Sequence, residues 1–264
     1  MVGLKNYFIG DAFADSLFNT DNEQREKVCS WKIQSNLLLF SGLTNDSWSW
    51  RAVGIPLDLL DKSLEGDIDL MFAMRHRSQD GDGPARFANM YRGFELKTAK
   101  VKKSGEVKSL KDGRFKKTIA QLQKLCDFGL PQVFLLEAFI VEAGFSLASN
   151  GTMPTEVRNS VASKRAQIEN KDFGYVALAI EQIPGYSEAH TGVVWPATTV
   201  KEAKTNPLRQ PFSRLASRVD EFAEKNGAIG GRLVVTFCYR CRTLTAVVAS
   251  GPYVCTKCRT SVIL

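Results

Sequence analysis

Two short segments of the chain carry acidic and basic side chains at the alternating spacing of a β-strand. Asp67 and Asp69 lie in the segment GDIDL, and Glu95 and Lys97 lie in the segment FELK. Residues two apart in a strand share one face, so pairing of the two strands would bring carboxylates together beside a lysine. Carboxylate oxygens bind Mg²⁺ or Mn²⁺, which polarises a phosphate, and an ammonium group can position the attacking water. Either motif alone is typical of an exposed polar strand face, but the two in succession favour phosphodiester hydrolysis.

Positive charge is concentrated in two stretches of a chain whose net charge is +7. Residues 100–117 hold eight Lys or Arg against two acids, and residues 232–264 hold five with no acid. A solvated loop is the simpler interpretation of one lysine-rich run, but two basic regions beside a candidate phosphate site favour nucleic acid. The candidate contacts with nucleic acid are Lys100, Lys102, Lys103, Lys108, Lys111, Arg114, Lys116, Lys117, Arg240 and Arg242.

Four of the six cysteines form two C-x-x-C pairs near the end of the chain. The pairs are Cys238 with Cys241 and Cys255 with Cys258. This spacing is typical of tetrahedral Zn²⁺, although two disulfides or an iron–sulfur cluster remain alternatives. A segment of about 35 residues buries too little apolar surface to fold alone, and a metal would supply the missing free energy. Four cysteines leave no open coordination position, so we expect structural Zn²⁺ in a module that resembles a zinc ribbon.

The two acidic segments need a scaffold of alternating strands and helices. A capping box at Thr20–Glu23 predicts a helix that runs to about Phe40, while residues 45–66 mix turn signals with short apolar pieces and receive no assignment. Further along, hydrophobic periodicity and length predict strands at 66–74, 91–98, 133–141 and 175–183, and helices at 115–128, 155–169 and 212–225.

The remaining stretches suggest loops, a domain boundary and a location. Residues 184–211 contain four prolines and little periodicity, so we expect a loop there. The run NGAIGG before the cysteines predicts a boundary between a domain at 1–228 and a module at 229–264. The most apolar segment, 133–145, is interrupted by two glutamates and is too short to span a bilayer. Without a secretory leader, the sequence favours a cytoplasmic protein that binds no membrane.

The acidic segments and the helix that contains Gln121 resemble the core of the PD-(D/E)xK nuclease superfamily. This superfamily includes restriction endonucleases, Holliday-junction resolvases and phage-type exonucleases. The resemblance implies an α/β fold with a restriction-endonuclease-like αβββαβ core, in which a mixed central sheet is flanked by helices, followed here by the small β-rich zinc ribbon. It also implies that Asp69 and Glu95 bind the divalent metal and that Lys97 assists the nucleophilic water.

Some positions depart from the pattern of that superfamily. No proline precedes the aspartate, so either Asp67 or Asp69 could be the main ligand, and Asp69 is preferred because related members carry G-x-I-D-L with the final acid as ligand. Gln121 resembles an accessory glutamine of some branches. A glutamate of the first helix, Glu26 or Glu23, could add a further carboxylate, although surface glutamates near a helix start are the simpler interpretation.

The residues and the resemblance together predict a Mg²⁺-dependent nuclease. We expect an endonuclease that acts on DNA in preference to RNA, with the zinc module helping to bind substrate or a partner. Two other hypotheses stay open, namely an RNA nuclease and a non-catalytic module that binds nucleic acid or protein while keeping a nuclease-like fold. A homodimer or a protein partner also stays open.

Overall fold

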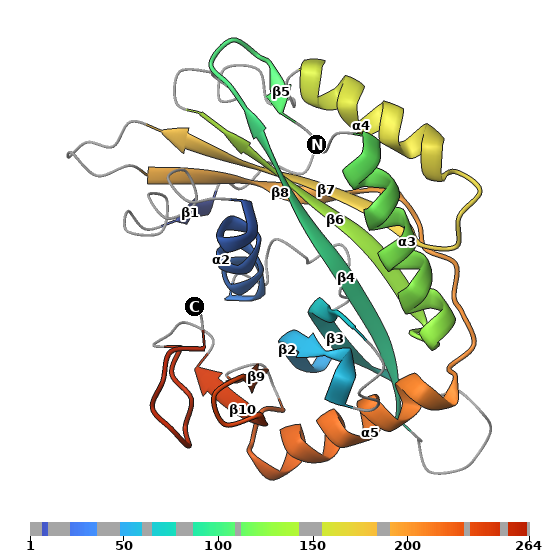
Figure 1. Cartoon of the computed structure of the whole chain (residues 1–264), viewed down its shortest axis with the longest axis vertical. Helices are drawn as coiled ribbons and strands as arrows, with labels where there is room; N and C mark the ends of the chain where they lie inside the picture. Colours follow the sequence, from blue (N-terminus) through green and yellow to red (C-terminus); the bar gives the residue numbers. More distant parts are fainter. Residues whose placement is uncertain are drawn as a thin grey trace.

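The computed structural model describes residues 7–9, 22–35, 48–59, 65–77, 87–108, 112–142, 155–183, 191–229, 233–248 and 253–262. These residues form a mixed β-sheet flanked by helices (Figure 1). The strands are β1 Tyr7–Ile9, β2 Trp48–Pro56, β3 Asp67–Arg77, β4 Phe87–Val101, β5 Val107–Lys108, β6 Gln132–Val141, β7 Gly174–Ile183, β8 Thr191–Lys201, β9 Leu233–Cys238 and β10 Thr243–Val248. The helices are α2 Asn22–Ser35, the 3₁₀ turn η2 Leu57–Leu59, α3 Asp112–Phe128, α4 Thr155–Ile168 and α5 Gln210–Lys225.

The strands follow the order β1-β8-β7-β6-β4-β3-β2-β9-β10, and β5 pairs with β4 beside this path. β4, β6 and β7 run parallel at the centre, while β2, β3 and β4 are antiparallel neighbours. Helices cover both faces of the central strands, so their side chains are apolar along almost the whole strand. In β6, every residue after Gln132 is buried.

The helices form one layer on each face of the sheet. On one face Trp31 of α2 belongs to the same core cluster as Phe94. On the other face Leu122 of α3 and Phe212 of α5 belong to a second cluster with Leu135. Figure 1 shows α2 on one side of the sheet and α3 and α4 on the other. Both layers lie against β4, the strand that carries Glu95 and Lys97.

Most predicted elements are confirmed with small shifts at their ends. The strands predicted at 66–74, 91–98, 133–141 and 175–183 are β3, β4, β6 and β7, and the later three predicted helices are α3, α4 and α5. The first predicted helix is α2, whose Thr20 cap and predicted end lie outside the described residues. The other two cysteines, Cys29 and Cys126, are buried in the core.

The prediction of a loop at 184–211 is wrong for its middle part. Residues 191–201 form β8, which pairs with β7 and β1. The register between β7 and β8 shifts where Ala177 pairs with Thr198 and Ala179 pairs with Trp195. Pro196 lies within this irregularity, where its missing N–H costs no regular ladder hydrogen bond. The proline that suggested a loop therefore marks a bulge in a strand.

The strand order joins the cysteine-rich segment, which comprises β9, β10 and the four clustered cysteines, to the rest of the sheet. β9 pairs in parallel with β2, through Ala52 with Val235 and Val53 with Thr236. The buried Thr236 hydroxyl also donates to the Val53 carbonyl at 2.8 Å. The boundary predicted at 228/229 stays a prediction, but hydrogen bonds cross it. No helix in the described part of the chain is long and apolar enough to cross a membrane.

Candidate functional site

β3 and β4 separate where the candidate acids lie. The last pair of their ladder is Leu70 with Phe94. Beyond it, the Leu96 N–H donates to Asp69 Oδ2 at 2.6 Å and the Thr98 N–H donates to Glu26 Oε1 at 3.4 Å. Buried backbone N–H groups need acceptors, and here carboxylates take the place of strand carbonyls. The opening of the ladder therefore gathers acids from β3 and α2 along the free edge of β4.

Lys97 lies between two carboxylates. Its Nζ is 2.8 Å from Glu95 Oε1 and 3.3 Å from Glu26 Oε2. The side chains of Lys97 and Glu95 are only 14% and 6% exposed, so water screens this contact weakly. Glu95 and Lys97 meet because they lie two apart on one strand, as expected. Glu26 joins them because α2 packs against β4. The sequence had left open whether Glu26 or Glu23 would do so.

The electrostatics of this group are dominated by burial and by like charge. Burial, followed by the charge of Glu95, raises the pKa of Asp69 well above its ordinary value. Burial also raises the pKa of Glu95 and Glu26, although Lys97 opposes both shifts. Burial alone would lower the pKa of Lys97, but the surrounding carboxylates outweigh it and raise the pKa above its ordinary value. The lysine therefore stays charged at neutral pH, while the acids carry an excess of negative charge that favours a cation.

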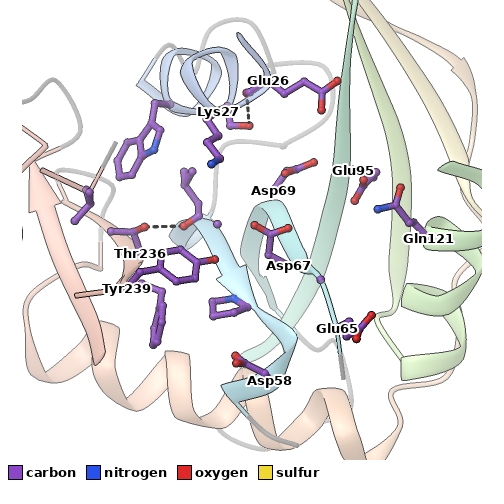
Figure 2. A pocket seen from close by; sticks show the side chains of 18 of the residues that line it. Glu26, Lys27, Asp58, Glu65, Asp67, Asp69, Glu95, Gln121, Thr236 and Tyr239 are labelled. Atoms are coloured by element: carbon purple, nitrogen blue, oxygen red, sulfur yellow. Dashed lines mark hydrogen bonds between the residues drawn. The ribbon is translucent and has the colours of Figure 1, made fainter. Parts of the chain in front are cut away.

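These acids line a cavity of about 610 Å³, which we call the acidic pocket (Figure 2). Its walls come from α2, β2, β3, β4, α3 and the cysteine-rich segment. Only Lys27 and Lys97 supply positive charge among the residues that line it, against six acids. The six are Glu26, Asp58, Glu65, Asp67, Asp69 and Glu95.

The oxygen donors of the acidic pocket fit a hard divalent cation. Asp67 and Asp69 are both half-buried on β3, and Figure 2 shows them together at the centre of the pocket, with Glu95 on the neighbouring strand. Within the described residues, only the four cysteines bring three or more ligand atoms within 4.8 Å of one another. Fewer than three of these acids therefore converge on one point. A cation held here would therefore have at most two of these carboxylates as ligands, and other oxygens would have to complete its shell.

One side of α3 leads into the acidic pocket. Gln121 is exposed on this helix and lines the pocket, and Figure 2 shows it beside Glu95. Lys117 lies one helical turn before Gln121 and Arg114 lies two turns before, so the three share a side of the helix. Both are exposed. Lys116 is also exposed but points away from this side, because it is five residues before Gln121.

The other lysines and arginines predicted to contact nucleic acid differ in their exposure and contacts. Lys100 is half-buried, Lys102 forms an ion pair with Glu106, and Lys103 and Lys108 are exposed. Lys111 lies outside the described residues. In the cysteine-rich segment, an Arg240 nitrogen donates to Thr260 Oγ1 at 3.0 Å, and Arg242 lies 3.7 Å from Asp58. The structure thus brings Arg114 and Lys117 toward the acidic pocket and leaves most of the other lysines on the hairpin of β4 and β5.

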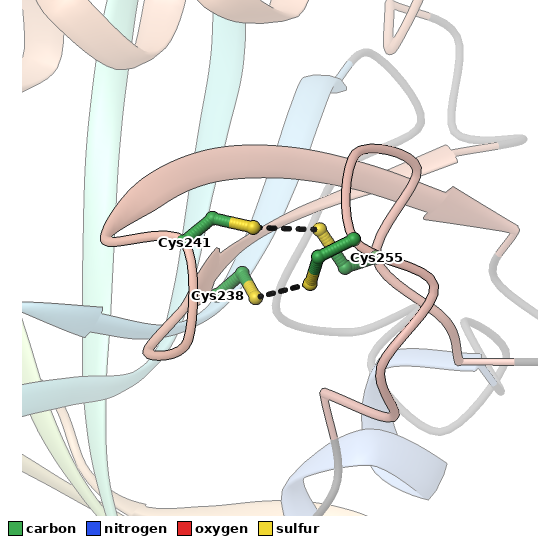
Figure 3. A group of neighbouring side chains, drawn as sticks. Cys238, Cys241 and Cys255 are labelled. Atoms are coloured by element: carbon green, nitrogen blue, oxygen red, sulfur yellow. Dashed lines mark hydrogen bonds between the residues drawn. The ribbon is translucent and has the colours of Figure 1, made fainter.

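The four cysteine thiols form a compact group (Figure 3). The Sγ atoms of Cys238 and Cys258 are 3.6 Å apart, and those of Cys241 and Cys255 are 3.9 Å apart. All four are free cysteines in the structure. Tetrahedral Zn–S bonds of about 2.3 Å would place the sulfur atoms about 3.8 Å apart, so the group fits a metal ion such as zinc.

The cysteine-rich segment also forms a wall of the acidic pocket. Nothing in the sequence pattern predicted this contact. Phe237 and Tyr239, from the first cysteine pair and the strand before it, line the pocket together with Thr236. Farther along the chain, the ring centroid of Tyr253 lies 4.5 Å from that of Trp31 on α2. The pairing of β9 with β2 creates this wall, and β2 is the segment that received no assignment from sequence.

Comparisons with protein-family models, curated proteins and solved structures found no match. The acidic pocket and the cysteine group are therefore the features that bear on function. Both are built from side chains whose chemistry is specific enough to test.

Proposed function

We propose that this protein is a Mg²⁺-dependent nuclease that hydrolyses phosphodiester bonds in DNA. The proposal rests on one observation, the meeting of Asp69, Glu95 and Lys97 in the acidic pocket where β3 and β4 separate. Apart from the 3₁₀ turn η2 and the two-residue strand β5, the element order α2-β2-β3-β4-α3-β6 is that of the αβββαβ core of the PD-(D/E)xK nucleases, which supports the same proposal. An endonuclease is the form we expect.

Asp69 and Glu95 would hold the cation, and Asp67 is the alternative to Asp69 as the aspartate ligand. Their raised pKa values reflect unfavourable burial of negative charge, which a divalent cation would relieve. The cation would supply Lewis-acid activation of the phosphate and of water. Mg²⁺ and Mn²⁺ are the ions that suit these oxygen donors.

Lys97 acts as a charged donor in this proposal. Because the neighbouring carboxylates raise its pKa, Lys97 keeps its proton at neutral pH and cannot serve as the general base. Its ammonium group, held by Glu95 and Glu26, instead orients the attacking water and offsets charge that develops on the phosphate.

Glu26, which contacts Lys97, is the carboxylate that would accept a proton. Water attacks phosphorus, a new P–O bond forms, the P–O bond to the leaving oxygen breaks, and the water proton passes to Glu26. The leaving oxygen takes a proton from solvent. A raised pKa suits Glu26 to this role, because a stronger base accepts the proton more readily.

The four-cysteine group would be a structural zinc ribbon. A site closed by four thiolates has no open position for water, so its role would be to hold β9, β10 and the two C-x-x-C turns in place. Metal analysis of the purified protein should find about one zinc per chain. Cys255→Ser should lose that zinc.

The decisive experiment is a cleavage assay on plasmid, single-stranded DNA and RNA, each with Mg²⁺, Mn²⁺ or EDTA. Glu95→Gln and Lys97→Met should lower the cleavage rate by about 100-fold or more, because each removes charge aligned with the reacting phosphate. The matched controls are Glu106→Gln and Lys103→Met, which change the same residue types on the exposed hairpin of β4 and β5. Both should retain the normal rate.

Three outcomes would change the proposal. Normal cleavage by both site variants would move the active site elsewhere. Cleavage of RNA but not of DNA would make RNA the substrate in place of DNA. Absence of cleavage under every condition, together with binding of nucleic acid, would favour the non-catalytic binding module.

A further inference from the structure

An aromatic side chain lies at the mouth of the acidic pocket. Tyr239 belongs to the first C-x-x-C turn, lines the pocket and is 56% exposed. Its ring packs edge-to-face against Phe237, with ring centroids 5.2 Å apart. Figure 2 shows Tyr239 across the pocket from Glu95, facing Asp67. The backbone of this turn is held by the hydrogen bond from the Arg242 N–H to the Cys238 carbonyl at 2.7 Å, so the ring projects from a braced support.

The surroundings of Tyr239 are unusual for an exposed ring. Large apolar side chains are normally buried, and this ring faces a group of carboxylates instead. A ligand that matches this wall would present a flat, polarizable ring beside a phosphate group. A nucleotide has both features.

We propose that Tyr239 stacks on a nucleobase next to the phosphodiester bond that is cut, and that the substrate is unpaired at that point. This inference rests on the proposed nuclease function. The geometry supports it in two ways. The carboxylates lie inside a pocket between α2 and the cysteine-rich segment, so the phosphate must enter with its neighbouring base. A protein ring stacks most readily on an unpaired base, whose faces are free of neighbouring bases.

The proposal gives the zinc module a specific task. It would act as a rigid support that sets the distance between the stacking ring and the carboxylates. On the other side of the pocket, Arg114 and Lys117 would follow the backbone of the strand as it arrives along α3. The substrate class is therefore single-stranded DNA or a single-stranded extension or gap within a duplex.

The test uses end-labelled oligonucleotides with Mg²⁺: a single strand, the matched duplex, and a duplex with a single-stranded extension. Wild-type protein should cut the single-stranded regions at least about tenfold faster than the duplex. Tyr239→Ala should slow cleavage of the single strand by roughly 5- to 100-fold, the loss expected for one stacked base. Tyr239→Phe keeps the ring and should stay within about twofold of wild type. Val248→Ala, which trims another exposed apolar side chain of the module, is the matched control.

A scan with abasic nucleotides separates stacking from a structural role. One abasic position beside the cut should slow the wild-type enzyme by the same factor as Tyr239→Ala, and should have no further effect on Tyr239→Ala. A merely structural tyrosine would leave the two losses additive. In Ca²⁺, Tyr239→Ala should also bind the uncut single strand more weakly than wild type does.

The outcomes separate this inference from the proposed function. Wild-type protein that cuts no nucleic acid would overturn the nuclease proposal itself. A wild-type enzyme that cuts duplex as fast as single strands, or a Tyr239→Ala variant with normal rates, would overturn the stacking inference alone. Equal losses in Tyr239→Phe and Tyr239→Ala would assign the role to the hydroxyl and would also overturn it.

Discussion

Two ionic clusters occupy neighbouring strands of the sheet and differ in their charge balance. The open cluster consists of Asp69, Glu95, Lys97 and Glu26 and lines the acidic pocket. The closed cluster consists of Glu137, Lys164 and Tyr175 and is buried under α4. The two are adjacent, because Lys97 on β4 and Glu137 on β6 are register partners.

The charges and hydrogen-bonding groups of the closed cluster find their partners within the cluster. Lys164 pairs with one oxygen of Glu137, and the Tyr175 hydroxyl donates to the other at 2.5 Å. The lysine also lies 5.6 Å from the centre of the Phe139 ring, a cation–π distance. One acid meets one base, and both carboxylate oxygens have donors. Such a cluster needs no ligand and serves to attach α4 to the sheet.

The open cluster leaves charge uncompensated. Three carboxylates share one lysine, and burial raises the pKa of each acid. Repulsion from neighbouring carboxylates adds to this shift at Asp69 and Glu95. A proton or a cation that enters the pocket would supply the missing positive charge. Imbalance of charge and access to a pocket, more than burial of charge, make the open cluster the candidate ligand site.

The largest expected difference between the clusters concerns catalysis. Asp69→Asn should lower the cleavage rate by about 10³-fold, because a neutral amide binds a divalent cation poorly. The amide oxygen can still accept from the Leu96 N–H, and one repelling charge is removed, so the melting temperature should hold or rise. Parallel measurements of rate and thermal unfolding check this. A variant that melts well below wild type would show that Asp69 is structural.

The closed cluster should respond in the opposite way. Glu137→Gln leaves Lys164 charged and buried without its partner, which should cost about 3–5 kcal/mol of unfolding free energy. The double variant Glu137→Gln/Lys164→Met removes both charges and should regain most of that loss. Urea unfolding measures the three free energies, and equal stability of the single and double variants would contradict a buried ion pair.

A smaller effect is expected for pH and Mg²⁺. Glu26 and Glu95 have ordinary pKa values of 4.5 that are raised in the folded protein, so the folded state binds more protons than the unfolded state. Without metal, stability should therefore fall as pH rises from about 4.5 through the raised pKa values. Saturating Mg²⁺ should restore about 3 kcal/mol at a concentration near 100 times Kd.

Thermal unfolding between pH 4 and pH 8, with Mg²⁺ or EDTA, measures this effect. Glu95→Gln should flatten the decline and weaken the response to Mg²⁺. Glu137→Gln is the control, and its Mg²⁺ response should match that of wild type despite its lower stability. A pH profile that is identical in wild type and Glu95→Gln would remove the electrostatic basis of the open cluster.

The smallest effect concerns the approach to the open cluster, which the closed cluster lacks. Lys117→Ala should weaken DNA binding a fewfold and reduce the salt slope by about one phosphate contact. Lys116→Ala changes the same residue type on another side of α3 and should change neither quantity. Fluorescence anisotropy at several salt concentrations distinguishes the two, and equal losses would place the DNA path elsewhere.

The candidate site could be predicted from sequence only where local spacing determines contact. Glu95 and Lys97 lie two apart on one strand, so their meeting follows from strand geometry alone. Glu26 could not be assigned in this way, because its contact with Lys97 depends on how α2 packs against β4. Glu137 was understood only as an interruption of an apolar segment, since nothing local reveals that Lys164 of a later helix reaches it.

The same division applies to the fold. Periodicity identified β6, β7, α3 and α5, because the apolar faces of these elements are continuous in sequence. β8 was missed, because a proline in a bulge resembles a proline in a loop. The cysteine spacing predicted a compact four-thiol group, yet it could not indicate that β9 would pair with β2 and bring Tyr239 to the acidic pocket.

The sequence by itself determined the chemical groups, their spacing along each strand and the closeness of the four cysteines, since all of these depend on short-range geometry. Only the tertiary structure decided which acids share one lysine, which ion pair is sealed from solvent, and which wall faces the carboxylates. These properties depend on contacts between residues far apart in the chain, such as Glu26 with Lys97 and Thr236 with Val53. Such contacts arise when apolar layers pack and strands select their neighbours, and no local pattern specifies either choice.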